Sequence, residues 1–273
     1  MVRRTITAIL AAAIACITPF DATALPGAAE PEVIFAVTGN TNPESPFVGF
    51  TESLPELVDA LNRENPLFVL HTGNIVRGGE DRVGIIEKDV SRQFSLFLES
   101  AMRLSMPLYT AAGALDLHNG STEIYTRRLG RPLDYSFNYD RIHIVVLNTV
   151  AVENPARSRD RQMKWLADDL ERNGKRGMTI VVTHDRLFSP VRGEAPFEGA
   201  EIIHQALNKH GVAAVISGSS ASFFTLTKDS VTYINAGCGG FNSSERCYSC
   251  AQYYLVSFKN GSVRAMPKYL KIK

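Results

Sequence analysis

The chain has 273 residues, of which 45% are hydrophobic and 21% are charged, and its 29 basic and 28 acidic side chains nearly balance. This composition excludes a disordered, collagen-like or coiled-coil protein, and the balanced charge lacks the excess of basic residues that is typical of nucleic-acid-binding proteins. The length is sufficient for a domain with a large hydrophobic core.

The N-terminal 24 residues are typical of a secretory signal peptide. Arg3 and Arg4 precede a mostly apolar run over residues 6–17, and small residues follow at positions 22–24. The apolar run is too short to span a bilayer, and no later segment is long enough to do so. The sequence therefore predicts a secreted or periplasmic protein without a transmembrane segment, whose mature chain begins near Leu25.

The cysteines lead to two further expectations. Cys16 stands where a lipoprotein signal would place its lipidated residue, so lipid anchoring is an alternative to full release. Cys238, Cys247 and Cys250 follow the signal, and in an oxidising compartment we predict a disulfide from Cys238 to either Cys247 or Cys250. A metal site or a redox role for the short C-Y-S-C segment are the alternatives.

Short apolar runs alternate with amphipathic stretches along the chain, which is the pattern of an α/β domain. We expect a short segment at residues 25–31 and then one domain at residues 32–273. The predicted elements, in order, are strand 33–38, helix 52–62, strand 67–71, helix 85–104, strand 108–111, a hairpin in 131–148 whose second strand is 142–148, helix 159–172, strand 178–183, helix 199–210, and strands 213–217, 231–235 and 253–258.

Five turns with small or polar residues follow predicted strands, at the carboxyl ends where α/β proteins bind their ligands. They lie at residues 37–42 (VTGNTN), 71–74 (HTGN), 112–116 (AGALD), 182–184 (VTH) and 217–221 (SGSSA). In this order and at this spacing they resemble the motifs of calcineurin-like metallophosphoesterases. The turns keep Gly39, Gly73, Gly113 and Gly218, which we expect the close backbone approach to require.

The resemblance extends between the turns. Residues 134–137 (DYSF) with 143–148 are similar to the central strand pair of that family, residues 162–166 (QMKWL) to its next helix, and residues 234–240 to a glycine-rich turn near its end. The similarity covers residues 33–258. It implies an α/β fold, a metallophosphoesterase-like β-sandwich flanked by helices in α/β/β/α layers.

The resemblance also implies which residues stand at the family's metal-ligand positions. His184 is the one ligand retained; the other six ligand positions hold Asn40, Asn42, Asn74, Ala114, Ser219 and Ala221. Leu115 replaces the histidine that assists the leaving group, and Asp116 remains in the place of the residue that orients it. Because neutral amides do not supply the negative charge that two divalent cations need, the sequence predicts no dinuclear metal site and no cofactor.

The leading functional hypothesis is therefore a non-catalytic, exported protein that binds a small ligand or a protein partner, and not nucleic acid. Asn40, Asn42, Asn74, Ala114, His184, Ser219, Ser220 and Ala221 would line a neutral pocket. A plainer interpretation is that these asparagines and serines only satisfy the backbone of the turns.

Two other hypotheses remain open at the level of sequence. The first is a metal-dependent phosphoesterase or other hydrolase with a rebuilt or single-metal site around His184, Asp116 and His118, with Asp185 nearby. The second is a protein-interaction module that uses the rim of the site or the insertion at residues 241–249.

Overall fold

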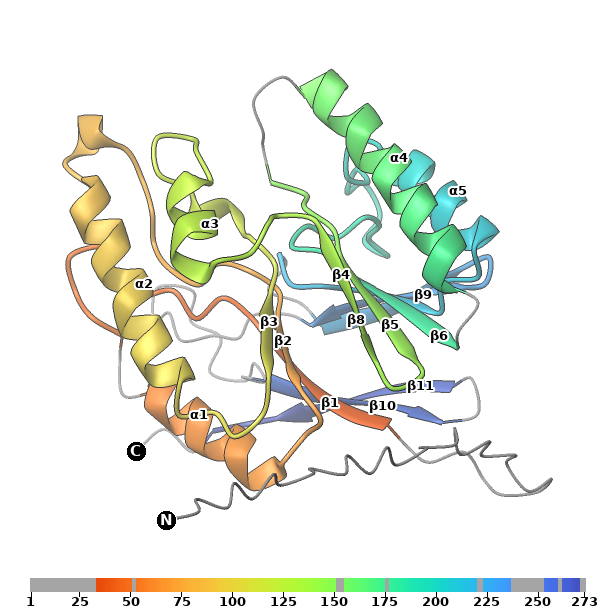
Figure 1. The fold of residues 1–273 in the computed structure, drawn as a ribbon, viewed down its shortest axis with the longest axis horizontal. Helices are drawn as coiled ribbons and strands as arrows, with labels where there is room; N and C mark the ends of the chain where they lie inside the picture. The colour runs from red at the N-terminus through yellow and green to blue at the C-terminus, as the bar shows by residue number, and fades with distance from the viewer. Residues whose placement is uncertain are drawn as a thin grey trace, which may run out of the picture. The chain divides into compact units, whose positions relative to one another are not determined.

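Two β-sheets pack face to face, and helices cover their outer faces, in the computed structural model of the chain (Figure 1). The structure describes residues 33–50, 53–150, 155–174, 177–219, 223–236, 253–259 and 262–270. In this part of the chain, none of the helices is both long and apolar enough to cross a membrane.

The first sheet has the strand order β11-β10-β1-β2-β3. Its strands are β1 (Val33–Thr38), β2 (Val69–His71), β3 (Leu108–Thr110), β10 (Tyr253–Lys259) and β11 (Ser262–Lys268). β1, β2 and β3 run parallel, and the register aligns Thr38 with His71 and His71 with Thr110. The turns after these three strands therefore begin side by side.

The second sheet has the strand order β4-β5-β6-β7-β9-β8. Its strands are β4 (Tyr135–Tyr139), β5 (Ile142–Val146), β6 (Met178–Val182), β7 (Ala214–Ser217), β8 (Phe223–Lys228) and β9 (Val231–Ala236). β5, β6, β7 and β9 are parallel, and β4 and β8 are antiparallel to their neighbours.

Side chains alternate between two cores along the strands, as the period of two requires. Phe35 and Val37 of β1 face Ile144 and Ile180 of the second sheet, in the core between the sheets. Ala36, between them, faces the helical layer. Because both faces of the central strands are buried, these strands are rich in valine and isoleucine rather than alternating with polar residues.

Three helices cover the first sheet: α1 (Ser53–Glu64), α2 (Glu87–Ala101) and α3 (Glu123–Leu129). Two cover the second: α4 (Pro155–Asn173) and α5 (Ala200–Lys209). Leu54, Leu57, Val58 and Leu61 place a buried apolar stripe on α1 at helical spacing. Two short 3-10 turns, η1 (Asp81–Val83) and η2 (Ala114–Asp116), lie in the loops after β2 and β3.

The predicted layer order and the predicted helices and strands are confirmed, with small shifts at their ends. Two edge strands, β8 and β11, and the two-turn helix α3 were not predicted. Two histidines of the second sheet and its helices are buried against specific partners. His143 of β5 is 2% exposed, and His204 of α5 is 3% exposed because Tyr233 and Asp229 bond to its ring.

Candidate functional site

The turns that follow β1, β2, β6 and β7 meet at one end of the two sheets and are held together by their backbones. The Asn40 N–H donates to the Gly73 carbonyl at 2.9 Å, and the Asn42 N–H donates to the Asn74 carbonyl at 3.1 Å. On the other sheet, the Gly218 N–H donates to the His184 carbonyl at 3.1 Å. Backbone bonds thus join four of the five sequence-predicted turns in two pairs, and side-chain bonds from Asn40 to Gly218 and from His184 to Thr72 link the pairs.

Asn40 and Asn74 form a chain of amide hydrogen bonds across this end of the molecule. Asn74 Nδ2 donates to Asn40 Oδ1 at 2.9 Å, and Asn40 Nδ2 donates to the Gly218 carbonyl at 2.8 Å. The Leu115 N–H donates to Asn74 Oδ1 at 2.9 Å. Both asparagines have left-handed backbones, with φ of 52° and 56°, a conformation that asparagine tolerates better than most residues. The chain joins the turns after β1, β2, β3 and β7.

Asp116 is fully buried beneath the Asn74 turn. Its Oδ2 accepts the N–H groups of Asn74 at 3.0 Å and Gly113 at 2.8 Å, and its Oδ1 accepts those of Ile75 at 2.7 Å and Val76 at 2.9 Å. Burial raises the pKa of Asp116 to about 7, and the four backbone hydrogen bonds oppose this rise. Asp116 therefore organises the backbone of two turns, with both of its carboxylate oxygens occupied.

His184 is buried and its ring is oriented by the turn after β2. Its Nδ1 lies 2.8 Å from the Thr72 carbonyl, which can only accept, so Nδ1 carries a proton. Burial lowers the pKa of His184, although the Thr72 carbonyl and the charge of Asp185 act in the opposite direction. The ring is consequently a neutral imidazole at physiological pH.

Thr72 lies at the centre of the site and has no equivalent among the residues singled out from the sequence. A Cβ at Gly39 would approach Thr72 Oγ1 to 2.2 Å, and one at Gly218 would approach it to 2.0 Å. A Cβ at Gly113 would lie 2.2 Å from the Asn74 backbone nitrogen. These contacts confirm that the glycines are required sterically. The HTGN pattern after a strand was the available signal for Thr72.

His71, at the end of β2, is a second buried neutral imidazole. The Gly73 N–H donates to its Nδ1 at 3.1 Å, so the proton resides on Nε2, which lies 3.0 Å from Thr41 Oγ1. Burial, and then the proximity of His184, lower the pKa of His71 to about 3. With both nitrogens bonded inside the protein, His71 braces the turns and is not presented to a ligand.

The remaining predicted site residues have varied surroundings. Asn42 is buried, and its Nδ2 donates to the Pro43 carbonyl at 3.4 Å. Ser219 Oγ accepts the Arg186 N–H at 3.1 Å. Ala114 is exposed at the start of η2, and Leu115 is half-buried. Ser220, Ala221, Cys16, Cys238, Cys247, Cys250 and residues 241–249 lie outside the described residues.

The side chains of the alternative single-metal centre each have separate partners. His118 Nε2 lies 3.0 Å from the Ile85 carbonyl and 3.3 Å from Asp81, whereas His184 faces Thr72. No group of three His, Cys, Asp or Glu side chains within the described ranges is arranged to hold a metal ion. Amide, hydroxyl and neutral imidazole groups do not fit a pair of divalent cations, which require anionic ligands.

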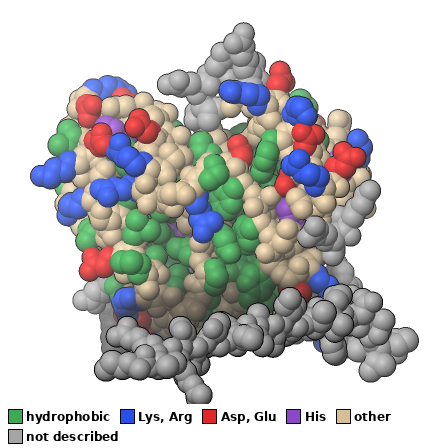
Figure 2. Space-filling view, in the orientation of Figure 1, with side chains coloured by type: hydrophobic (Ala, Val, Ile, Leu, Met, Phe, Trp, Pro, Cys, Tyr) green, Lys and Arg blue, Asp and Glu red, His purple; other side chains and the backbone are tan. Residues whose placement is uncertain are grey.

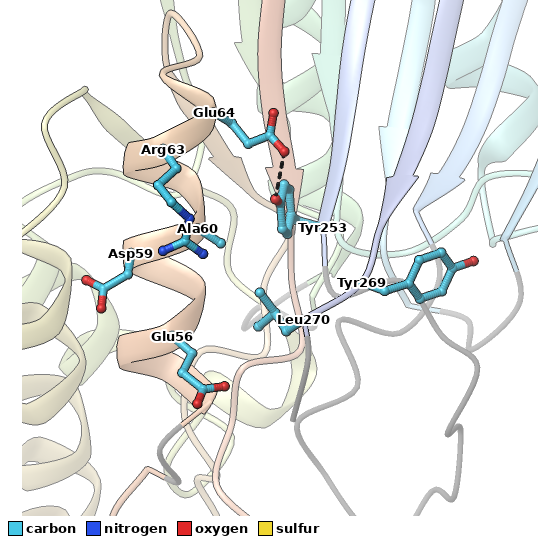
Figure 3. Close-up of a pocket in the computed structure, with 8 residues that line it drawn as sticks. All are labelled: Glu56, Asp59, Ala60, Arg63, Glu64, Tyr253, Tyr269 and Leu270. Atoms are coloured by element: carbon cyan, nitrogen blue, oxygen red, sulfur yellow. Dashed lines mark hydrogen bonds between the residues drawn. The ribbon is translucent and has the colours of Figure 1, made fainter. Parts of the chain in front are cut away.

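A separate cavity of about 400 Å³ lies between α1 and the ends of β10 and β11 (Figure 3). Three of the polar side chains in its walls are paired: the Tyr253 hydroxyl donates to Glu64 at 3.2 Å, Lys268 lies 2.8 Å from Glu64, and Asp59 bonds to Arg103. Tyr269 and Leu270, which follow β11, also line it. None of the five turns contributes a residue to it, so it is distinct from the site described above.

Solved structures with the same fold include both an enzyme and an anchoring protein. A dimetal phosphatase from Danio rerio has a TM-score of 0.64 and 12% identity, over 87% of this chain and 99% of that one. GAP50, the anchor in the inner membrane complex of Plasmodium, has a TM-score of 0.59 and 12% identity, over 88% and 90%. A purple acid phosphatase from yellow lupin seeds has a TM-score of 0.64 and 12% identity, over 87% of this chain and 52% of that one.

Sequence comparison agrees with the fold. No curated protein matches the chain. The family model of the calcineurin-like phosphoesterases matches residues 47–219, which is more than half of the sequence and spans the turns from Asn74 to Ser219. This chain therefore belongs to the calcineurin-like phosphoesterase family.

Proposed function

We propose that this chain is an exported, non-catalytic member of its family that acts by binding another molecule. The observation that carries the proposal is the amide chain from Gly218 through Asn40 and Asn74 to Leu115, which stands where the family resemblance places metal ligands. In place of carboxylates that hold cations, the turns carry neutral side chains that bond to one another.

The same hydrogen bonds favour a macromolecular partner over a small ligand in the crevice. The backbone of the turns already forms hydrogen bonds with the side chains of Asn40, Asn74, Asp116 and Ser219, as the plainer sequence interpretation expected. A small ligand would have to compete with these bonds. A rigid cluster of turns is instead a suitable base for a binding surface elsewhere on the domain.

The structural likenesses include both a catalytic and an anchoring protein. One protein of the same fold is described as a dimetal phosphatase, and another as an anchor in a membrane complex. At 12% identity these likenesses concern the fold alone, and one fold supports both roles. The choice between them therefore rests on the side chains of the site.

A hydrolysis assay tests the non-catalytic role. Purified mature chain, incubated in turn with manganese, iron and zinc, should leave p-nitrophenyl phosphate and bis(p-nitrophenyl) phosphate intact at the rate of the buffer control. A dimetal phosphatase of the same fold, assayed in parallel, supplies the positive control. Hydrolysis by this chain that disappears on chelation and returns with metal would refute the proposal.

Export is tested independently of catalysis. Expression of the full chain in a secreting bacterial host should yield an extracytoplasmic product whose N-terminus lies near Leu25. Retention of Met1 in a cytoplasmic product would contradict export. A product that begins at Cys16 and carries lipid would show that the chain is anchored to the membrane rather than fully released.

A further inference from the structure

The edge strand β4 lacks the features that usually protect a free sheet edge. In the described part of the chain β4 pairs with β5 alone, and its sequence YSFNY contains no charge, proline or glycine. Natural edge strands are commonly blunted by lysine, by proline or by a cover. Two other outer strands follow that rule: β8 carries Lys228, and β11 carries Arg264, Pro267 and Lys268.

The neighbouring edge, β3, is closed by a side chain from β4. The Tyr135 hydroxyl accepts the Thr110 N–H at 3.0 Å and donates to the Thr110 carbonyl at 3.0 Å. Of the two edges that meet on this side of the sandwich, β3 is therefore capped at Thr110. The β4 edge keeps its outward backbone groups.

The hairpin geometry identifies those groups. Tyr139 and Ile142 are paired across the two-residue loop, so they form a hydrogen-bonded pair, and such pairs recur at every second residue. Ser136 and Asn138 then direct their N–H and C=O groups away from β5. No described residue outside the hairpin bonds to the backbone of either one. Four groups are available to an added strand.

The edge is also rigid, because both faces of β4 are held. On one face, Ser136 Oγ donates to Asp169 at 2.8 Å, and Asn138 Oδ1 lies 2.9 Å from His143 Nδ1. On the other, the Phe137 ring stacks on Tyr109 with their centroids 3.6 Å apart. A strand that is already ordered loses little conformational entropy when a partner binds.

The surface beside β4 is apolar with a basic group in it. Figure 2 shows hydrophobic side chains gathered over β3 and β4, with a basic side chain among them. The Arg131 guanidinium lies 5.0 Å from the Tyr109 ring centre and 5.6 Å from that of Tyr135. Across the described ranges Arg131 makes no ion pair with a carboxylate, so its charge is available near the start of β4.

We propose that the free edge of β4 docks an extended segment of a protein partner, which adds a strand to the six-stranded sheet. The segment would bond to the outward backbone groups of Ser136 and Asn138, place apolar side chains beside Phe137, and set a carboxylate against Arg131. This inference rests on the proposed binding role and gives it a location away from the turn cluster.

Synthetic peptides test the strand addition. The probe is Glu-Val-Thr-Val-Thr-Val-Glu, with its ends blocked, titrated into the whole mature chain. Successive residues of a strand point their N–H groups to opposite sides. N-methylation of the three valines therefore blocks one edge of the peptide strand, and N-methylation of the two threonines blocks the other. One methylated peptide should bind as the parent does, and the other should bind at least about tenfold more weakly. Equal binding of both would overturn the proposal, as would no binding by the parent.

Two protein variants locate the site. Asn138→Pro removes one outward N–H, and Asn138→Thr is its matched control, since both lose the contact with His143. With both variants shown to be folded by circular dichroism, the proline variant should bind the peptide about tenfold more weakly than the threonine variant. Equal affinities would exclude the β4 edge.

The charge requirement is tested with Arg131→Gln. This variant should bind the parent peptide about threefold more weakly, whereas its affinity for a peptide with glutamines in place of both glutamates should equal that of the original chain.

Sedimentation tests whether a second copy of the chain occupies the edge instead. A dimer of the chain that Asn138→Pro dissociates would make the partner a second copy and overturn the peptide assignment. Absence of hydrolysis and of metal binding is measured separately, so failure here leaves the proposed non-catalytic role standing.

Discussion

The amide of Asn40, at a position where the family resemblance implies a carboxylate, differs from a carboxylate in both charge and hydrogen bonding. An amide donates to the Gly218 carbonyl at 2.8 Å, which a carboxylate does not do. Asn40→Asp should therefore lower the free energy of unfolding by about 1–3 kcal/mol near neutral pH. The new carboxyl would face a carbonyl, so its pKa would be raised, and stability should return as the pH falls below that pKa.

Urea unfolding at about pH 7.5 and about pH 4.5 measures this effect. Asn208→Asp is the matched control, because Asn208 is exposed on α5 and the same chemical change should alter stability by less than about 0.5 kcal/mol. Equal stability of Asn40→Asp and the original chain near neutral pH would show that the amide chain is not a structural element.

His71 makes a second residue-scale prediction, on pH. Its pKa of about 3 in the folded chain lies below its unfolded value, so the unfolded chain binds the proton first as the pH falls. The contribution of His71 to the free energy of unfolding is complete above the unfolded pKa of about 6.5. As the pH falls from there toward the folded pKa, this contribution is lost at about 1.4 kcal/mol per pH unit. In His71→Gln, the slope of the unfolding free energy against pH between these two pKa values should be smaller by about 1.4 kcal/mol per pH unit, which is the contribution of one proton. An unchanged slope, or a ring that titrates near its ordinary pKa by NMR, would contradict the buried neutral state.

Residue patterns predicted which turns converge but not how their side chains would bond. The five turns follow strands whose order is readable from apolar runs, so the approach of Asn40, Asn74 and His184 to one end of the sheets follows from topology. The partners of each amide depend on distances of a few tenths of an ångström between loops. The sequence does not encode these locally, which is why Thr72 was missed.

At the scale of elements, a buried polar cluster fixes the β4–β5 hairpin to α4. Asp169 of α4 accepts from Ser136 at 2.8 Å and lies 2.8 Å from His143 Nε2. Burial alone would raise the pKa of Asp169, but the hydrogen bonds from His143 and Ser136 outweigh it and leave the pKa below its usual value. The stabilisation is thus present above the unfolded pKa and is lost as the pH falls through the folded one.

The adjacent aspartates on α4 provide a matched test of this cluster. Asp169→Asn should lower the unfolding free energy by about 2–4 kcal/mol, because it breaks a buried pair. Asp168→Asn should change it by less than about 1 kcal/mol, since Asp168 pairs with Lys164 on an exposed surface. Similar losses in the two variants, measured by urea unfolding, would show that the cluster does not anchor the hairpin.

Elements with strong burial contrast were predicted well, and those without it were missed. β1 matched its predicted bounds because five of its six residues are apolar and the strand leads into a glycine turn. β8 has no fully buried residue, β11 carries Pro267 and charged side chains, and α3 has seven residues. Such edge strands and two-turn helices owe their conformation to neighbours rather than to their own pattern.

At the scale of the whole molecule, the domain keeps the scaffold on which its family builds a metal centre. If the turns also keep the backbone course, restored side chains should restore metal binding. The combined change is Asn40→Asp, Asn42→His, Asn74→Asp, Ala114→Asn, Ser219→His and Ala221→His, which would join His184. Two Mn²⁺ should bind the folded variant, with little hydrolysis, since turnover also needs a productive substrate pose. No binding would indicate that the turns have diverged with the ligands.

Calorimetric titration of Mn²⁺ into the unaltered mature chain, with the restored variant alongside, tests the central claim most directly. The amide chain through Asn40 and Asn74 supplies no negative charge at these two positions, where the family resemblance implies metal ligands, so no stoichiometric binding to the unaltered chain is predicted. Two Mn²⁺ bound per unaltered chain would contradict it and would identify the protein as a metal-loaded member of its family.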